Sequence, residues 1–286
     1  MDTTIWSGIR RYIFYHRNCM DGFCAAWIAR RMFPNAKFVA VQYDDGGFPQ
    51  VEHGATVYIL DFSYKPDIIR DLAERSQKVT VLDHHKTAEQ NLNPLMGKVN
   101  NLIIRFDMNK SGGRLAWEHF YPANNPHWLV DYTEDHDLWR HRLPNTKEIA
   151  AYIYSWPLDF EIWDNWSRFP HPPQEWVNEG AAILRKERLI VNNHVAQARE
   201  IEMGGHRILA VNATVLFSDI AGKLAEDRPF GACYFEKANG RRQWALRSRD
   251  GGIDVSVIAK AYGGGGHKNA SGFEESIDTN PWRART

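Results

Sequence analysis

The chain has 286 residues, of which 43% are hydrophobic and 24% are charged, and 35 basic and 35 acidic residues leave it with a formal net charge of zero. This composition is typical of one large or two ordinary globular domains and excludes a largely disordered chain. Proteins that hold long nucleic acids by charge are usually basic, so a long duplex is not an expected partner. No stretch approaches the roughly 18 apolar residues of a membrane span, so we expect no membrane association.

The cysteines indicate a reducing environment. Cys19, Cys24 and Cys233 form no C-x-x-C pair and no even set that would suggest a disulfide framework. Because the N-terminus also lacks the long apolar core of a secretion signal, we expect free thiols and a cytoplasmic location. The sequence leaves open whether the protein forms a homodimer.

Short apolar runs alternate with helical patterns from about residue 11 to residue 120. Such alternation predicts an α/β fold with a doubly wound, mainly parallel sheet and helices on both faces. The runs are continuously apolar, as strands covered on both faces usually are. The expected strands are 12–15, 38–42, 57–60, 79–82 and 102–105, and the expected helices are 22–32, 66–76 and 113–121, the last with Ser111 as its N-cap.

The pattern changes after residue 140. Prolines interrupt the stretch up to 173, and a long helical pattern then runs from Gln174 to about Glu202. After Gly204-Gly205, a smaller mixed α/β pattern begins, with strands at 207–211, 231–236 and 243–248 and helices at 218–226 and 254–261. We therefore expect an N-terminal domain 1–140, a helical linker 141–203 and a smaller mixed α/β C-terminal domain 204–286.

Acidic and imidazole side chains follow three of the expected N-terminal strands. In an open parallel sheet the carboxyl ends of the strands share one edge, where ligands bind. Carboxylates and imidazoles at the end of buried strands are costly to desolvate unless a cation compensates them, so the pattern predicts a metal site. The residues are His16 and Asp21 after the first strand, Asp61 after the third, and Asp83, His84 and His85 after the fourth.

The residue types indicate which metal would bind. Further acids, Asp135 and Asp137, lie in the stretch 131–139. Carboxylates with a few imidazoles and no thiolate cluster select hard to borderline ions, so Mn²⁺ is expected first and Mg²⁺ or Co²⁺ next. With this many acids we expect two ions that share a carboxylate, an arrangement suited to in-line displacement at phosphorus.

These motifs resemble the DHH phosphoesterase family, which is named for the triplet found here at 83–85. The segment 264–272, near the C-terminus, resembles the G-G-G-H-x-x-A-[AS]-G loop of the DHH-associated C-terminal domain. The likeness covers nearly the whole chain, with four N-terminal motifs in order and the C-terminal loop. It points toward members such as nanoRNases (oligoribonucleases) and 3′-phosphoadenosine 5′-phosphate (pAp) phosphatases. The resemblance implies a two-domain enzyme with a dinuclear manganese site that hydrolyses phosphoester bonds of nucleotides or short oligonucleotides.

The resemblance also implies roles for single residues. Asp61 would bridge the two ions. His16 would bind one ion, while Asp21, His84 and an acid of the fourth motif would bind the other. The first motif departs from the family's D-x-D-G pattern, because Cys19 stands where the first aspartate would be. The His16 side of the site would therefore lack one hard ligand, unless the Cys19 thiolate or a water replaces it.

For the acid of the fourth motif we prefer Asp135, because Trp139 follows it at the spacing of the family's D-x-x-x-[FW] pattern; Asp137 lies close behind. Asp83 would orient the neighbouring histidines as a hydrogen-bond acceptor or reach the metal itself. His85 would face the scissile phosphate, so Asp61, Asp83 and His85 are the expected catalytic residues.

The C-terminal loop is the expected substrate-holding element. Glycines let backbone amides approach an anion closely, and arginine can grip phosphate with two hydrogen bonds. Such a domain would clamp one end of a short nucleotide. The expected substrate-binding residues are Arg247, Gly264, Gly265, Gly266, His267, Lys268 and, more weakly, Asn269 and Arg249.

Three functions fit these observations. The first is a manganese-dependent phosphodiesterase or phosphatase on nano-RNA, linear or cyclic dinucleotides, or pAp. The second is a RecJ-like exonuclease on longer single strands, and the third is a nucleotide-binding sensor whose metal site is weakened at Cys19. Seven of the eleven tryptophans lie between 117 and 176 and could stack on bases, but we expect most of them to pack between layers.

Overall fold

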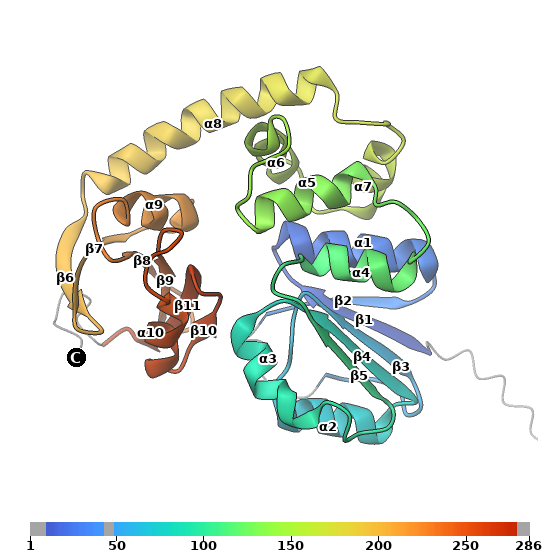
Figure 1. The fold of residues 1–286 in the computed structure, drawn as a ribbon. Coiled ribbons are helices and arrows are strands. Elements are labelled where there is room, and N and C mark those ends of the chain that lie inside the picture. Colours follow the sequence, from blue (N-terminus) through green and yellow to red (C-terminus); the bar gives the residue numbers. More distant parts are fainter. Residues whose placement is uncertain (1–9, 43–48, 279–286) are drawn as a thin grey trace, which may run out of the picture. The chain divides into compact units, whose positions relative to one another are not determined.

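The computed structural model describes residues 10–42 and 49–278 (Figure 1). The chain divides into two compact units, Met1–Ile183 and Leu184–Thr286. This boundary lies inside a helix, and the three-part division at 140 and 203 remains a prediction.

The first unit is built on a five-stranded, fully parallel sheet with the strand order β2-β1-β3-β4-β5. All five strands lie where the apolar runs predict them, so the expected parallel sheet is confirmed. The order places β1, β3 and β4 side by side in the centre. The strands are β1 (Arg11–His16), β2 (Lys37–Val41), β3 (Thr56–Leu60), β4 (Lys78–Asp83) and β5 (Leu102–Phe106).

Helices cover both faces of this sheet. Helices α1 (Met20–Met32) and α4 (Gly112–Phe120) lie on one face, and α2 (Pro66–Arg75) and α3 (Lys86–Leu92), followed by the short 3-10 helix η1 (Asn93–Leu95), lie on the other (Figure 1). Successive strand residues enter different cores, because Ile13 packs into the first core and Phe14 into the second. This two-sided burial explains why the strands are continuously apolar.

The predicted starts of two helices are confirmed in detail. Pro66 occupies the first turn of α2, where its missing N–H costs no hydrogen bond. The Ser111 hydroxyl accepts a hydrogen bond from the backbone N–H of Arg114 and so caps α4.

Three further helices follow in the first unit, for which the sequence pattern predicts no separate bounds. The first lies within the expected domain 1–140, and the other two lie in the expected helical linker 141–203. They are α5 (Trp128–Asp137), α6 (Thr146–Tyr154) and α7 (Phe160–Trp166). Aromatic packing holds α7 to α1, since Trp163 lies 5.3 Å from Phe23 and 5.9 Å from Trp27 between ring centroids. Five of the seven clustered tryptophans are buried, namely Trp117, Trp128, Trp163, Trp166 and Trp176.

The long helix is shorter than predicted. α8 (Gln174–Val195) ends before residue 202, and Arg199–Met203 forms strand β6 instead. The reason is the pair Gly204-Gly205, whose φ angles of 57° and 75° form a tight turn that pairs β6 antiparallel with β7 (His206–Asn212). Two-residue turns with positive φ are the favoured hairpin connections.

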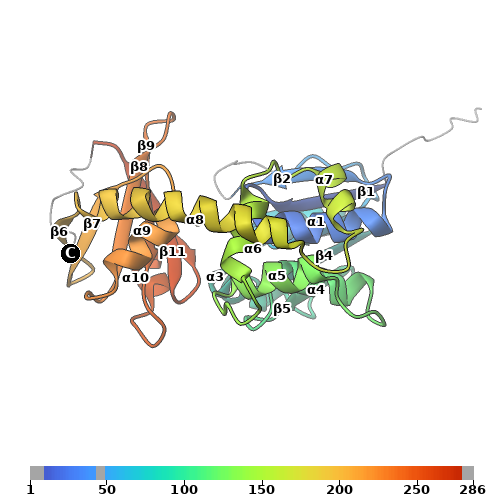
Figure 2. The ribbon, with the colours of Figure 1, turned by 90° about the horizontal axis from the view of Figure 1, so that it is seen from above.

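The second unit contains a six-stranded mixed sheet with the order β10-β11-β9-β8-β7-β6, in which β7 and β8 run parallel and the other neighbours are antiparallel. Figure 2 labels most of these strands, together with the helices of the unit. The smaller mixed α/β fold expected for the C-terminal region is thereby confirmed, although β10 and the first residues of β11 lie in the stretch 264–272, which was expected to be a loop. Its other elements are β8 (Gly231–Glu236), β9 (Arg241–Arg247), β10 (Gly265–Gly266), β11 (Ala270–Ser276), α9 (Phe217–Leu224) and α10 (Val255–Ala261).

Every helix in the described part of the chain is too short or too polar to cross a lipid bilayer. Cys19, Cys24 and Cys233 are all free thiols, as expected from their spacing.

Candidate metal centre

The predicted ligand-type residues of the first unit occupy the carboxyl ends of neighbouring strands and the ends of two helices. His16 ends β1, Asp61 follows β3, and Asp83 ends β4, with His84 and His85 leading into α3; Asp21 lies in the first turn of α1 and Asp137 ends α5. Because β1, β3 and β4 are adjacent, their ends meet at one edge of the sheet.

The side chains form two groups of three whose ligand atoms lie within 4.8 Å of one another. One group contains His16, Asp61 and His85, and the other contains Asp21, His84 and Asp137. Asp61 joins them, because its Oδ2 lies 3.5 Å from His16 Nδ1 and its Oδ1 lies 3.1 Å from His84 Nε2. His84 Nε2 also lies 3.6 Å from Asp21 Oδ2 and 3.6 Å from Asp137 Oδ2.

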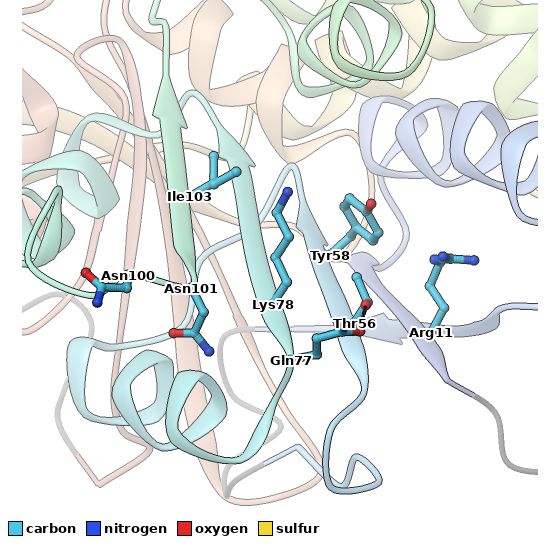
Figure 3. Close-up of a pocket in the computed structure, with 8 residues that line it drawn as sticks. All are labelled: Arg11, Thr56, Tyr58, Gln77, Lys78, Asn100, Asn101 and Ile103. Atoms are coloured by element: carbon cyan, nitrogen blue, oxygen red, sulfur yellow. Dashed lines mark hydrogen bonds between the residues drawn. The ribbon is translucent and has the colours of Figure 1, made fainter. Parts of the chain in front are cut away.

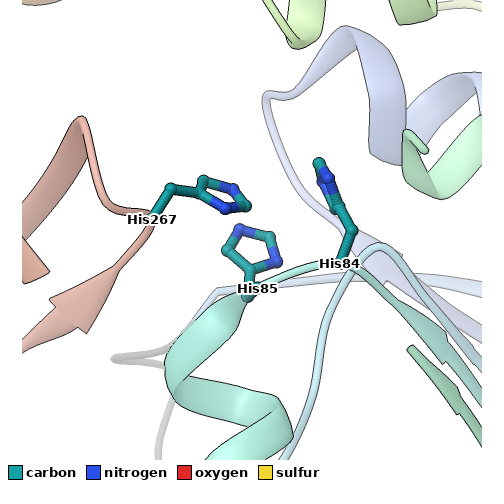
Figure 4. A group of neighbouring side chains, drawn as sticks. All are labelled: His84, His85 and His267. Carbon is teal, nitrogen blue, oxygen red and sulfur yellow. The ribbon is translucent and has the colours of Figure 1, made fainter. Parts of the chain in front are cut away.

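Asp83 is engaged entirely by protein donors. Its Oδ1 accepts hydrogen bonds from the backbone N–H of His84 at 2.7 Å and from His85 Nδ1 at 2.6 Å, and its Oδ2 accepts one from the Ser63 hydroxyl at 2.6 Å. Burial would raise the pKa of Asp83, but the interactions with His85, and to a lesser extent with His84, lower it below its usual value. Of its two predicted roles, the contacts fit the orientation of the histidines; Figure 4 draws His84 and His85 at the end of β4.

The N-terminus of α4 positions two of the carboxylates. The backbone N–H groups of Gly112 and Gly113 donate to the two oxygens of Asp21, at 2.5 and 2.8 Å. A Cβ on Gly112 would lie 2.4 Å from the Cβ of Asp61, so only glycine permits this approach. Asp61 itself adopts a φ of 52°, in the left-handed region that aspartate and asparagine tolerate better than most residues.

The electrostatics are those of a buried, mainly anionic cluster. Burial would raise the pKa of Asp61, but contacts with His16 and His84 hold it well below its usual range. Burial and the nearby Asp61 and Asp137 raise the pKa of Asp21 well above its usual range. Burial would lower the pKa of His84, but Asp137, Asp61 and Asp21 outweigh it and raise that pKa well above the ordinary value. Buried like charges of this kind are stabilised by a cation.

Asp135, the preferred acid of the fourth motif, lies elsewhere. Its carboxylate accepts hydrogen bonds from the backbone N–H groups of Arg142 and Leu143, at 2.9 and 3.0 Å, and from the Thr146 hydroxyl at 2.5 Å. Residues two apart on a helix point about 200° away from each other, so Asp135 and Asp137 cannot share one face. The structure therefore places Asp137, and not Asp135, beside His84.

Cys19 occupies the N-cap position of α1 but makes no capping hydrogen bond with its side chain. It belongs to neither group of three. Burial, followed by the carboxylates of Asp61, Asp137 and Asp21, raises the pKa of its thiol well above the usual range. The neutral thiol is therefore the favoured form in this environment.

In the second unit, two of the predicted substrate-binding residues serve local structure. The Arg247 guanidinium donates to the Ser218 hydroxyl at 2.7 Å and to the Leu246 carbonyl at 2.9 Å, and burial lowers its pKa to about 10. The Asn269 side-chain amide donates to the Arg249 carbonyl at 3.1 Å and to Asp250 Oδ1 at 2.9 Å, which ties two loops together.

The glycine loop is a hairpin. Gly265 and Gly266 pair with Gly272 and Ser271 of β11, and the His267 N–H donates to the Ala270 carbonyl at 2.8 Å. A Cβ on Gly264 would lie 2.0 Å from the Gly272 carbonyl oxygen. The Lys268 carbonyl accepts a hydrogen bond from Val255 N–H at 2.9 Å. His267, which Figure 4 also labels, belongs to this hairpin.

A surface hollow in the first unit lies away from the candidate metal centre. It is formed at the amino-terminal ends of the strands, since Arg11, Thr56 and Lys78 begin β1, β3 and β4 (Figure 3). The metal-ligand candidates occupy the opposite ends of the same strands. The hollow is lined by Arg11, Thr56, Tyr58, Gln77, Lys78, Asn100, Asn101 and Ile103.

Three residues that support the centre were not predicted. Ser63 follows the strand β3, where a polar residue two positions after Asp61 could have signalled a partner for a neighbouring strand end. Gly112 and Gly113 follow the predicted N-cap Ser111, and helix N-termini are common anion-holding positions. The available signal was the combination of a cap and two glycines.

No protein-family model matches the chain. A curated relative, the uncharacterized protein R106 of Acanthamoeba polyphaga mimivirus, is 28% identical over 284 residues. The alignment covers 91% of this chain and 66% of the relative. The chain thus spans slightly less than two thirds of the relative's length, and the relative is uncharacterized.

Several solved structures are similar over most of the chain. A pGpG-specific phosphodiesterase, PggH of Vibrio cholerae, has a TM-score of 0.45 at 14% identity and covers 94% of each chain. RecJ of Thermus thermophilus in complex with Mn²⁺ has a TM-score of 0.48 at 14% identity and covers 94% of this chain and 50% of RecJ. An uncharacterized Helicobacter pylori protein has a TM-score of 0.46 at 14% identity, with 96% and 94% covered. At these values, no activity follows from the likeness.

Proposed function

We propose that the first unit binds two divalent cations and that the protein is a DHH-type phosphoesterase that hydrolyses short nucleotides. One observation carries this proposal. Two groups of three metal-compatible side chains lie at the ends of adjacent parallel strands, and a single carboxylate, Asp61, contacts a histidine of each group. A shared carboxylate between paired ions is the arrangement that suits displacement at phosphorus.

The residues present fit such ions. Each group supplies only imidazole nitrogens and carboxylate oxygens, a donor set that favours Mn²⁺ and also accepts Mg²⁺ or Co²⁺. Asp61 is 1% exposed, and its Oδ2 is 3.5 Å from His16 Nδ1, which is longer than a normal hydrogen bond. The fold therefore buries this oxygen without a strong protein donor, as expected for an oxygen that binds a cation.

When bound, the cations would neutralise charge on the phosphoryl group and lower the pKa of a water molecule. Asp61 would set the spacing of the two groups. Asp83 would hold His85 in one orientation and one tautomer, because its carboxylate accepts the Nδ1 proton. Asp137 would replace Asp135 as the acid of the fourth motif.

Short substrates are proposed because the net charge of zero provides no broad basic surface for a long polyanion. The candidates are nano-RNA, linear or cyclic dinucleotides, and pAp. We propose that the hairpin with Gly264–Gly266, His267 and Lys268 holds the substrate. Arg247 and Asn269 are proposed in supporting roles, since their side chains already bond to neighbouring loops and strands.

The direct test uses metal-stripped protein with and without Mn²⁺. Labelled RNA and DNA from dimers to 24-mers, cyclic dinucleotides and pAp are incubated, and the products are resolved. We expect Mn²⁺-dependent turnover of the shortest substrates. Equal rates on dimers and 24-mers would instead indicate the RecJ-like exonuclease, and binding without any turnover would indicate the sensor.

The Asp61→Asn variant tests the shared carboxylate. Asparagine tolerates the left-handed backbone at this position but removes the negative charge. We expect kcat/KM to fall by about 1000-fold, since cation stabilisation of the transition state contributes several kcal/mol. The control is Asp71→Asn, which loses only a surface ion pair with Arg75 on α2 and should change activity less than about twofold. Near-full activity of Asp61→Asn would refute the proposed ligand set.

A further inference from the structure

An aromatic surface lies directly after the candidate ligand Asp137. The chain turns back at the end of α5, where the N–H groups of Arg140 and His141 both donate to the Asp135 carbonyl. Trp139 and His141 adopt φ angles of 53° and 48° in this turn. Such angles are unfavourable for residues with large side chains, and they persist where surrounding structure enforces them. The hydrogen bonds that hold the Asp135 carboxylate provide that enforcement.

The rings in this region contact one another. His136 stacks on Trp139 with centroids 6.3 Å apart and planes 25° apart, and it lies 5.9 Å from the Tyr154 ring. The His141 ring is 5.5 Å from Trp139 and 5.8 Å from His136. We call these four residues the aromatic surface.

Two members of the aromatic surface are unusually exposed. Trp139 and Tyr154 are each 49% exposed, whereas the other tryptophans of the described residues, apart from Trp156, are at most 9% exposed. The Trp139 ring is left half in water although its backbone conformation disfavours a large side chain, so burial of apolar surface does not explain a tryptophan at this position.

The aromatic surface adjoins the candidate metal centre within the same unit. Trp139 is two residues beyond Asp137, and Tyr154 interacts electrostatically with Asp137 and Cys19. The Tyr154 hydroxyl also interacts with the backbone of Met20, the residue before Asp21. The aromatic surface therefore lies next to Asp137 and near the start of α1, which carries Asp21.

We propose that Trp139 and Tyr154 stack on the base of the nucleotide whose phosphate is held at the candidate metal centre. This inference rests on the proposed function for the position of the phosphate. Stacking on aromatic side chains tolerates any base and contributes binding energy for each stacked base. The surface thus selects substrates that carry a nucleobase beside the reacting phosphate, and it disfavours base-free phosphoesters.

The test compares a dinucleotide with its abasic analogue, which has the same backbone without the base. Binding to the full-length protein is measured by calorimetry with Ca²⁺ in place of Mn²⁺, and turnover is measured separately with Mn²⁺. Wild type should bind the dinucleotide about 5- to 150-fold more tightly than the abasic analogue. The variants Trp139→Leu and Tyr154→Leu should lose most of this preference, and Trp139→Phe should keep most of it.

Leucine is a suitable replacement for Trp139, whose φ is 53°, because Leu216 already adopts a φ of 48° in this protein. The matched control is Trp156→Leu. Trp156 is 45% exposed, lies outside the aromatic surface, and its ring is tilted by 52° to that of Tyr152. This variant should keep the wild-type preference. A Trp139→Leu protein that melts like wild type and still prefers the dinucleotide would overturn the proposal, as would a wild type without any preference.

The two proposals can fail separately. If no substrate is turned over with Mn²⁺ but the base preference depends on Trp139, the phosphoesterase proposal fails and the base-stacking surface stands. If turnover is observed and the Leu variants treat both substrates as wild type does, the base-stacking surface fails alone.

Discussion

The two motifs that stand out in the sequence lie at the end of the sheet in the first unit and in the glycine hairpin of the second. They differ in whether the fold itself explains their residues. In the first unit, Asp21 and Asp61 are each 1% exposed and lie on either side of His84, which is 2% exposed. Folding alone does not require this arrangement. In the second unit, Gly264 permits a close backbone approach to Gly272, and the Asn269 side chain forms a hydrogen bond with Asp250. A functional interpretation is strongest where the fold gives no other reason for a residue.

The largest effect that we expect from a single substitution on stability tests the structural role of the hairpin. In Gly264→Ala, the new Cβ would meet the Gly272 carbonyl oxygen at 2.0 Å, a backbone atom that cannot rotate away. We expect the free energy of unfolding to fall by about 3 kcal/mol, measured by urea denaturation.

The matched control is Gly222→Ala in α9, where a Cβ meets nothing within 4 Å and should stabilise the helix by about 0.5–1 kcal/mol. If both variants are equally stable, the close approach in the hairpin is not the reason for glycine at 264, and a substrate-holding role for its backbone becomes the better explanation.

The next effect tests the first unit. Asp83→Asn keeps the shape of the side chain but removes its charge, which weakens the hydrogen bond that it accepts from His85 Nδ1. We expect kcat/KM to fall by about 10- to 100-fold, as for other residues that orient metal-binding histidines. Ser63→Ala, which removes one hydrogen bond to the same carboxylate, should cost less. A larger loss in Ser63→Ala than in Asp83→Asn would contradict this order.

The last effect is a dependence of stability on pH in the metal-free protein. The folded state raises the pKa values of His84 and Asp21, so the stability that they contribute is complete below their unfolded pKa values and is lost as the pH rises through the folded ones. Denaturation from pH 6 to pH 9 should therefore show falling stability, by at most about 1.4 kcal/mol per pH unit for each proton released.

His84→Gln should flatten this slope, whereas replacing the exposed His171 with glutamine should not. Mn²⁺ should offset the loss, because a cation replaces the protons as the compensating charge. An unchanged slope in His84→Gln would show that the cluster does not control the pH dependence.

The sheet of the first unit was predictable because its strands are short, apolar and separated by helical patterns. The ends of those strands were predictable for the same reason, and with them the meeting of His16, Asp61 and His84. The helices α5, α6 and α7 were not, since prolines and tryptophans obscure their periodicity and their stability comes from packing on α1.

Two differences between the sequence-based expectations and the structure have simple physical causes. The helical pattern of the sequence continues past Val195, where α8 ends. The pair Gly204-Gly205 would have indicated β6 if it had been interpreted as a hairpin turn and not as a domain boundary. The choice between Asp135 and Asp137 depends on which helix face meets the sheet edge. Spacing within a motif does not supply that information, because it depends on how α5 packs against α1.

The start of α4 has a consequence for the affinity of the candidate centre. Two backbone amides hold Asp21, and the bare Cα of Gly112 lies against Asp61, so the docking of one helix orders both carboxylates. The loss of side-chain entropy that an incoming ligand would otherwise impose thus occurs during folding. Affinity at this centre is therefore linked to how tightly a single βα unit stays closed, and mutations that loosen α4 should weaken binding without touching any ligand atom.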